Sequence, residues 1–151
     1  MNKLSAPAEL RNAMQALVQS LGLMQENVTP CSQEMSVGEA HTLMFLLSDS
    51  SPSQQELADV LGIDKSTAHR LVKKLSNQGL LLVEPSEHDA RAKCLRLTEQ
   101  GRKRANTVDR ASQVLFLQIQ EQIPEDLQID VLNSVRILAE AIKKTTKGRN
   151  R

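Results

Sequence analysis

A predicted helix over about residues 64–77 carries side chains that could grip the edges and backbone of a nucleic-acid duplex. An arginine can hydrogen-bond both acceptors of a guanine, hydroxyls can meet bases or phosphates, and lysines neutralise phosphates without reading sequence. We expect Arg70 to read a base and Lys73 and Lys74 to contact phosphates. An ordinary solvated face is the alternative, above all for His69. The predicted contact set on this helix is Ser66, Thr67, His69, Arg70, Lys73 and Lys74.

A second basic group is predicted at the tip of a hairpin. Residues 85–91 form a polar turn between two short strand-like segments, and Lys93 lies at the start of the second one. Arg91 could enter a minor groove, whose negative potential attracts guanidinium groups. Asp89 could orient Arg91, or the two could form an ordinary ion pair that stiffens the turn. We therefore add Arg91 and Lys93 to the predicted contact set, with Asp89 as their support.

Two short helices must position these groups. Ser53-Gln54-Gln55-Glu56 has the form of a capping box and starts a short helix whose inward residues are Leu57, Ala58 and Leu61. Gly62 ends that helix, as a glycine at a helix C-terminus does. The helix over 64–77 follows at once. Two short helices around a tight glycine-containing turn predict a helix-turn-helix.

The segment after this helix changes character. Gly79 closes the helix, and residues 80–84 and 92–97 are short and strand-like. The polar turn over 85–91 joins the two strands. A hairpin directly after a helix-turn-helix is a wing. The predicted fold is therefore mainly α with a small β-hairpin wing.

Amphipathic helices precede this winged unit. A first helix is predicted over about 7–28, ended by residues 29–30, and a second runs from a capping box at Ser36 and Glu39 to about Leu47. The first helix carries one apolar stripe at three- and four-residue steps. Its members are Leu10, Met14, Leu17, Val18, Leu21, Met24 and Val28.

Two more helices follow the hairpin. Thr98 caps a fifth helix that reaches about Ile123, and residues 124–126 open a sixth. The sixth helix has its own stripe of Leu127, Val131, Leu132, Val135, Leu138, Ala139 and Ile142. The first and sixth helices flank a small domain with little surface to cover such stripes. We therefore expect the stripes to bury against a second copy of the chain.

The chain thus divides into four predicted parts. Residues 1–35 hold the N-terminal dimerisation helix, and residues 36–104 form the winged helix-turn-helix. Residues 105–145 form the C-terminal dimerisation helices. Residues 146–151 are a basic tail that we expect to be disordered.

The motifs in the winged part resemble those of the MarR family of regulators. The helix reads Asp-Lys-Ser-Thr-Ala-His-Arg-Leu-Val from Asp64, and the wing reads Asp89-x-Arg91 followed by Leu95-x-Leu97-Thr98-x-x-Gly101. The spacing of the wing motifs is the most specific part of the resemblance, which is close over residues 53–104.

This resemblance implies a homodimer whose first, fifth and sixth helices intertwine. It also implies a pseudo-palindromic operator on double-stranded DNA and, usually, repression that a small ligand or oxidation relieves. The chain is accordingly predicted to be a sequence-specific DNA-binding transcriptional regulator, most simply a repressor. A winged module that binds only proteins is the rival reading, because fold alone does not settle function.

A metal-responsive regulator is one alternative for the signal. Cys31, Glu39 and His41 are all of ligand type for zinc and are similar to part of the site in zinc-sensing members of the family. Such members also use histidines on the fifth helix, where this chain has Val108, Asp109, Arg110 and Ser112 instead. We therefore expect no cofactor, with zinc as an alternative.

Two other signals stay open. Cys31 could be a redox switch, although the tyrosines that support the cysteine of peroxide-sensing relatives are absent from this sequence. An apolar small-molecule effector could instead lie between the dimerisation helices and the winged domain. Flexible methionines and a phenylalanine could line its cleft: Met14, Met24, Met35, Met44 and Phe45. The sequence does not identify the effector.

Composition excludes other classes of function. No apolar run approaches the roughly 20 residues of a membrane-spanning helix, and the first residues lack the apolar core of a signal peptide, so we expect a cytoplasmic protein that makes no membrane contact. No phosphate loop, nucleophile motif or paired metal-binding histidines indicate an enzyme. Residues 51–105 carry ten Lys and Arg against seven Asp and Glu, so the modest positive excess lies where the predicted contacts are.

Overall fold

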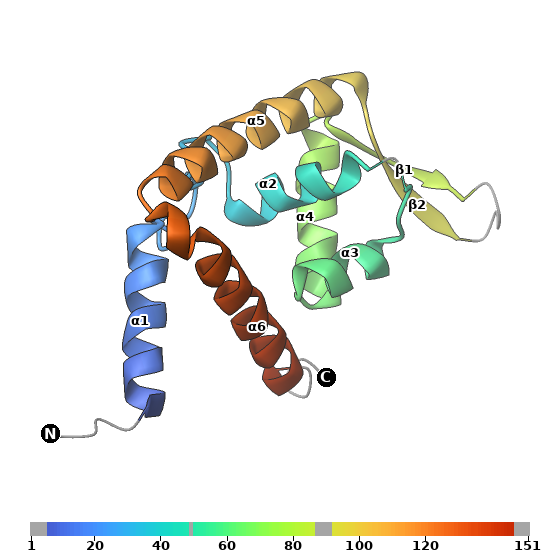
Figure 1. The fold of residues 1–151 in the computed structure, drawn as a ribbon. Coiled ribbons are helices and arrows are strands. Elements are labelled where there is room, and N and C mark those ends of the chain that lie inside the picture. The colour runs from blue at the N-terminus through green and yellow to red at the C-terminus, as the bar shows by residue number, and fades with distance from the viewer. Residues whose placement is uncertain (1–5, 49, 87–91, 147–151) are drawn as a thin grey trace, which may run out of the picture.

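The computed structural model describes residues 6–48, 50–86 and 92–146 and is mainly helical, with one antiparallel hairpin (Figure 1). The sequence therefore predicted the fold class correctly. The elements are α1 (Ala6–Ser20), α2 (Val37–Leu46), α3 (Gln54–Leu61), α4 (Lys65–Asn77), β1 (Leu81–Pro85), β2 (Lys93–Leu97), α5 (Glu99–Glu121), the short 3-10 helix η1 (Glu125–Leu127) and α6 (Gln128–Thr146).

Local capping explains where the helices of the winged part begin. Ser36 and Ser53 each accept a hydrogen bond from the backbone three residues later, and the glutamate there bonds back to the serine backbone. Both predicted capping boxes are thus confirmed. Asp64 caps α4 through the backbone N–H of Thr67. Gly62, at φ 66°, ends α3 in the left-handed conformation and turns the chain into α4.

Each strand of the hairpin begins one residue later than predicted. In its register Leu81 pairs with Leu97 and Glu84 with Cys94. Leu80 is not part of β1, because its backbone N–H bonds to the carbonyl of Leu75 and so completes the end of α4 after Gly79. The wing tip, with the predicted contacts Asp89 and Arg91, lies outside the described residues.

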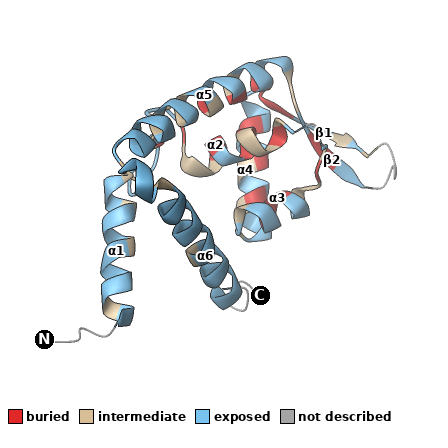
Figure 2. Cartoon of the chain, in the orientation of Figure 1, coloured by how far each residue is buried: buried red, intermediate tan, exposed pale blue. Residues whose placement is uncertain are grey.

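The core lies where α2 packs against α3, α4 and α5 and the hairpin closes one side. Its largest fully buried side chains come from every one of these elements: Leu43, Thr42, Leu57, Leu75, Leu81, Leu95 and Val108. Figure 2 shows the buried residues concentrated in this winged part. The core therefore fixes α4 by its apolar side.

The first helix is shorter than its apolar stripe predicted. It ends at Ser20 rather than near residue 28, because Gly22 takes φ 67° and the N–H of Leu23 bonds back to the carbonyl of Val18. Met24, which the stripe placed on this helix, lies after the turn and is 77% exposed. At the other end, the predicted start of the sixth helix is a 3-10 turn before α6.

The helices α1 and α6 project from the winged part with their apolar sides uncovered. None of the residues of α1 or α6 is buried in the single chain (Figure 2). The exposed large apolar residues of α1, α6 and the second half of α5 include Leu10, Leu17, Val114, Phe116, Leu117, Ile129, Leu132, Val135 and Ile137. Within the described ranges, every helix is too short or too polar for a bilayer crossing.

Candidate nucleic-acid interface

The helix α4 presents one polar face to solvent and one apolar face to the core. Ala68, Val72 and Leu75 are buried, and these side chains hold the helix in place. The predicted contact residues Ser66, His69, Arg70, Lys73 and Lys74 are all exposed, and Thr67 is half-buried. The predicted face thus exists as a continuous surface on the second helix of the helix-turn-helix.

Asp64 organises the first turn of this face. It accepts hydrogen bonds from the backbone N–H of Thr67 at 2.8 Å, from the hydroxyl of Thr67 at 2.8 Å and from the hydroxyl of Ser66. The Ser66 hydroxyl, followed by the backbone and side chain of Thr67, holds the pKa of Asp64 far below its usual range. The carboxylate is therefore ionised and fixes both hydroxyls.

Arg70 belongs to the same network. Its Nη2 donates to the hydroxyl oxygen of Thr67 at 2.9 Å, so the guanidinium lies over the N-terminal half of α4. That half is the part of a recognition helix that enters the major groove. Lys73 lies one turn further along and, unlike Arg70, shows no hydrogen bond or ion pair to the described residues.

Lys74 has a partner that the sequence reasoning missed. Its ammonium lies 3.0 Å from Oε2 of Glu39 in α2, whose side chain is only 3% exposed. Burial alone would raise the pKa of Glu39, but hydrogen bonds from Ser36 and from Lys74 outweigh it and lower that pKa. Lys74 therefore ties α4 to α2.

No local signal could have revealed this pair. Glu39 and Lys74 lie 35 residues apart, and the pattern around Glu39 is explained by its place in the capping box. Burial could have indicated it, because Glu39 directly precedes the core residue Ala40 and lies one turn before the core residue Leu43. A buried carboxylate needs a cation as well as hydrogen-bond donors.

The described part of the wing contributes one predicted contact residue. Lys93 is exposed at the start of β2, opposite Pro85. On the strand, Arg96 lies 3.7 Å from Glu84, an exposed cross-strand ion pair. Cys94 is buried, with its thiol 3.7 Å from the carbonyl of Pro85, and so serves in packing.

The three candidate metal ligands do not meet. No group of three His, Cys, Asp or Glu side chains within residues 6–48, 50–86 and 92–146 is arranged to hold a metal ion. The carboxylate of Glu39 is committed to Ser36 and Lys74. Cys31 lies 3.1 Å from the hydroxyl of Thr29, and His41 is exposed on α2.

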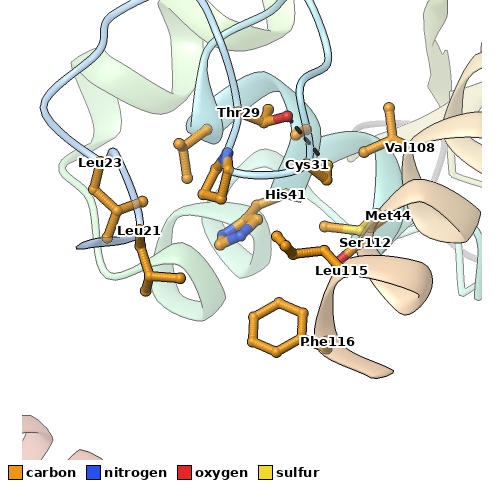
Figure 3. Close-up of a pocket in the computed structure, with 13 residues that line it drawn as sticks. Leu21, Leu23, Thr29, Cys31, His41, Met44, Val108, Ser112, Leu115 and Phe116 are labelled. Carbon is orange, nitrogen blue, oxygen red and sulfur yellow. Dashed lines mark hydrogen bonds between the residues drawn. The ribbon is translucent and has the colours of Figure 1, made fainter. Parts of the chain in front are cut away.

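Cys31 and His41 instead share the wall of an apolar pocket. The pocket has a volume of about 190 Å³ and lies between the α1–α2 segment, α2 and α5 (Figure 3). Its other walls are mainly aliphatic or aromatic, including Leu21, Leu23, Met44, Val108, Leu115 and Phe116. Of the predicted effector-cleft residues, Met44 lines this pocket, whereas Met14, Met24, Met35 and Phe45 do not.

Comparisons with known proteins agree with this geometry. A model of the MarR family matches residues 34–92. The uncharacterized HTH-type transcriptional regulator YybA of Bacillus subtilis is 40% identical over 50 residues, which make up 33% of each chain. The chain thus aligns with about a third of the length of this curated relative.

Solved structures extend the likeness to nearly the whole chain. A MarR transcriptional regulator from Methanosarcina mazei Go1 superposes with a TM-score of 0.68 at 21% identity, over 89% of this chain and 99% of that one. MepR of S. aureus, in a complex with DNA, gives a TM-score of 0.68 at 17% identity, over 93% and 99%. At these identities the likeness establishes the fold. A model of the MarR family thus matches the winged part of the chain, and the fold that the structure describes is similar to that of solved MarR regulators.

Proposed function

We propose that the protein is a transcriptional regulator, and not an enzyme, that binds double-stranded DNA as a homodimer. The observation that carries this proposal is the face of α4, where Ser66, Arg70 and Lys73 are exposed directly opposite the buried Ala68 and Val72. On the second helix of a helix-turn-helix, this face is the one that meets a major groove. Such a regulator acts in the cytoplasm, beside the chromosome.

The polar residues of this face divide by chemistry. Arg70 would read a guanine through its two acceptors, and Ser66 and Thr67 would meet base edges through their hydroxyl oxygens. Lys73 would neutralise a phosphate and add affinity without sequence preference. Beyond α4, Lys93 and Arg91 of the wing would contact the neighbouring backbone or minor groove, with Asp89 orienting Arg91.

The uncovered apolar helices supply the argument for the dimer. Leu17 of α1, Phe116 of α5 and Val135 of α6 are each about half exposed in the single chain. The helices α1 and α6 have no buried residue, and the buried residues of α5 all lie in its first half. Apolar surface of this extent usually marks an interface. A two-fold axis would place the two copies of α4 about 34 Å apart, one turn of duplex, and would call for a pseudo-palindromic operator.

A small ligand is the signal that the geometry favours, and we propose that it releases a repressor from its operator. The pocket beside α2 is largely apolar and lies between the helices that would dimerise and the winged part. It therefore suits an apolar molecule with one polar group, which His41 could meet. A zinc-responsive mechanism has less support, because no three candidate ligands among the described residues are grouped to hold a metal ion.

Selection of random duplexes by the purified full-length protein tests the proposal. We expect enrichment of an inverted repeat whose half-sites are about one helical turn apart. Arg70→Ala should lose the preference at one base pair of each half-site, whereas Lys103→Ala, which removes an exposed cation on α5, should bind as the wild type does. Failure to enrich any sequence would contradict sequence-specific DNA binding.

A further inference from the structure

The C-terminal end of α6 lies beside the turn that leads into α4. Lys143 and Thr146 line an open cleft of about 980 Å³ whose other wall includes Asp64 and Lys65, the cap and first residue of α4. Figure 1 shows α6 running from the end of α5 toward α3 and the start of α4. A segment distant in sequence thus reaches the part of the fold that would approach a duplex.

This end of α6 is cationic. Lys143 and Lys144 are both exposed, and neither has a carboxylate within ion-pair distance in the part of the chain that the structure describes. The sequence continues with the same charge: residues 143–151 contain five Lys and Arg and no Asp or Glu. The last acidic residue before this run is Glu140.

Helix stability explains only part of this charge. Cations near a helix C-terminus are favoured by the helix dipole, an effect confined to about the last turn. Lys143 and Lys144 lie in the last turn that the structure describes, and three further bases follow them in the sequence, at 147, 149 and 151. Five bases are more than the dipole of one last turn requires.

We propose that the cationic end of α6, carried by Lys143 and Lys144, contacts phosphates of the duplex that α4 enters. This inference rests on the proposed function. Lys143 lines the same cleft as Asp64 and Lys65 at the start of α4, and the N-terminal half of α4 is the part expected to enter the major groove. The two carboxylates that line this cleft with Lys143 already have other hydrogen-bond donors: Asp64 accepts from the hydroxyls of Ser66 and Thr67, and Asp59 accepts from the side-chain amide of Gln55.

Salt dependence of DNA binding tests this contact. The variants are Lys143→Gln and the double variant Lys143→Gln/Lys144→Gln, titrated by fluorescence anisotropy against the selected operator and an unrelated duplex of equal length. The slope of log affinity against log salt should become shallower by about 0.9 for each lysine that contacts a phosphate, and each substitution removes two such lysines from the proposed dimer. The loss should be equal on both duplexes, because phosphate contacts carry no sequence information.

Two further variants control for charge and for folding. Lys103→Gln removes one exposed lysine from α5, where its partner is Glu99 at 2.9 Å, and should leave the slope unchanged. Lys143→Arg keeps the positive charge and should retain the wild-type slope. The dimer is measured in parallel by sedimentation velocity at the same salt concentrations.

Each outcome bears on either the α6 contact or the proposed function. A slope unchanged in the double variant overturns the contact, and so does an affinity loss that coincides with dissociation of the dimer, which would place the end of α6 in the subunit interface. Failure of the wild-type protein to bind either duplex at low salt would instead refute the proposed function. The two ideas therefore fail in distinguishable ways.

Discussion

The carbonyl oxygen of Leu80 occupies the position where a side chain at Gly101 would begin. A Cβ built on Gly101 would lie 1.8 Å from that oxygen, far inside any contact distance. The same carbonyl accepts the backbone N–H of Thr98 at 3.1 Å, and the Thr98 hydroxyl donates to the carbonyl of Gly79 at 2.6 Å. The Leu97-Thr98-x-x-Gly101 pattern is thus the joint between the wing and α5.

Gly101→Ala should destabilise the fold by about 1–3 kcal/mol, because the clash is with backbone that neighbouring hydrogen bonds hold in place. Urea unfolding measures the change. The matched control is Gly38→Ala in α2, where the added methyl would meet the Leu71 side chain at an ordinary 3.4 Å. That control should be neutral or stabilising by up to about 1 kcal/mol. Equal effects at both glycines would contradict the interpretation of the joint.

Arg70→Ala and Lys73→Ala should weaken DNA binding in different ways. Loss of a bidentate base contact costs about 1–3 kcal/mol and relaxes the preference at one base pair. Loss of a phosphate contact lowers affinity about equally for all duplexes. Competition binding with single-base operator variants separates the two. A uniform loss for Arg70→Ala would reassign Arg70 as a phosphate contact.

Glu39→Gln should lower stability near neutral pH by about 1–2 kcal/mol, because a charge-assisted hydrogen bond is lost while the capping geometry can remain. The pKa of Glu39 is lowered in the folded protein, so its contribution is present above the unfolded pKa of about 4.3 and is lost as the pH falls through the folded value.

Urea midpoints measured between pH 3 and 7 check this dependence. The difference between wild type and Glu39→Gln should be largest at neutral pH and should shrink in acid. Ser36→Ala offers a comparison, because it removes a hydroxyl that donates to Glu39 without removing the charge that faces Lys74. A difference that grows in acid would refute the assigned direction of the shift.

Val135→Glu should dissociate the proposed dimer. The side chain is 52% exposed in the single chain and lies on the apolar stripe of α6, so a partner would bury it. Burying an unpaired carboxylate is costly, and we expect the dimer dissociation constant to rise at least about tenfold, or about 1.4 kcal/mol. Asn133→Glu, at a polar position of the same helix, is the control. Sedimentation equilibrium measures both, and an unchanged Val135→Glu dimer would exclude this face.

Local chemistry made most of the fold predictable. The capping contacts of Ser53, Gly62 and Thr98 are with residues three or four positions away, so these helix ends could be predicted from neighbouring sequence. The predicted end of the first helix was wrong. Met24 and Val28 keep the helical period of the stripe beyond Gly22, and periodicity alone does not record that the chain has turned.

The parts that escaped prediction are long-range contacts. The ion pair between Glu39 and Lys74 and the approach of Gly101 to Leu80 each join elements that pack together only in the finished fold. Residue types at these positions were visible, and the glycine even belonged to a recognised motif. Why Glu39 and Gly101 occupy these positions becomes clear only from Lys74 and Leu80, which contact them from other elements.

The hydrogen-bond directions around Asp64 constrain which base edges α4 can read. Because the ionised carboxylate can only accept hydrogen bonds, the Ser66 and Thr67 hydroxyls both donate their protons to it. What Ser66 then offers outward is oxygen lone pairs, while Thr67 already uses one for Arg70. We therefore expect the Ser66 and Thr67 oxygens to accept hydrogen bonds from base amino groups, those of cytosine N4 or adenine N6. Guanine, which presents acceptors, would be bound by the Arg70 guanidinium.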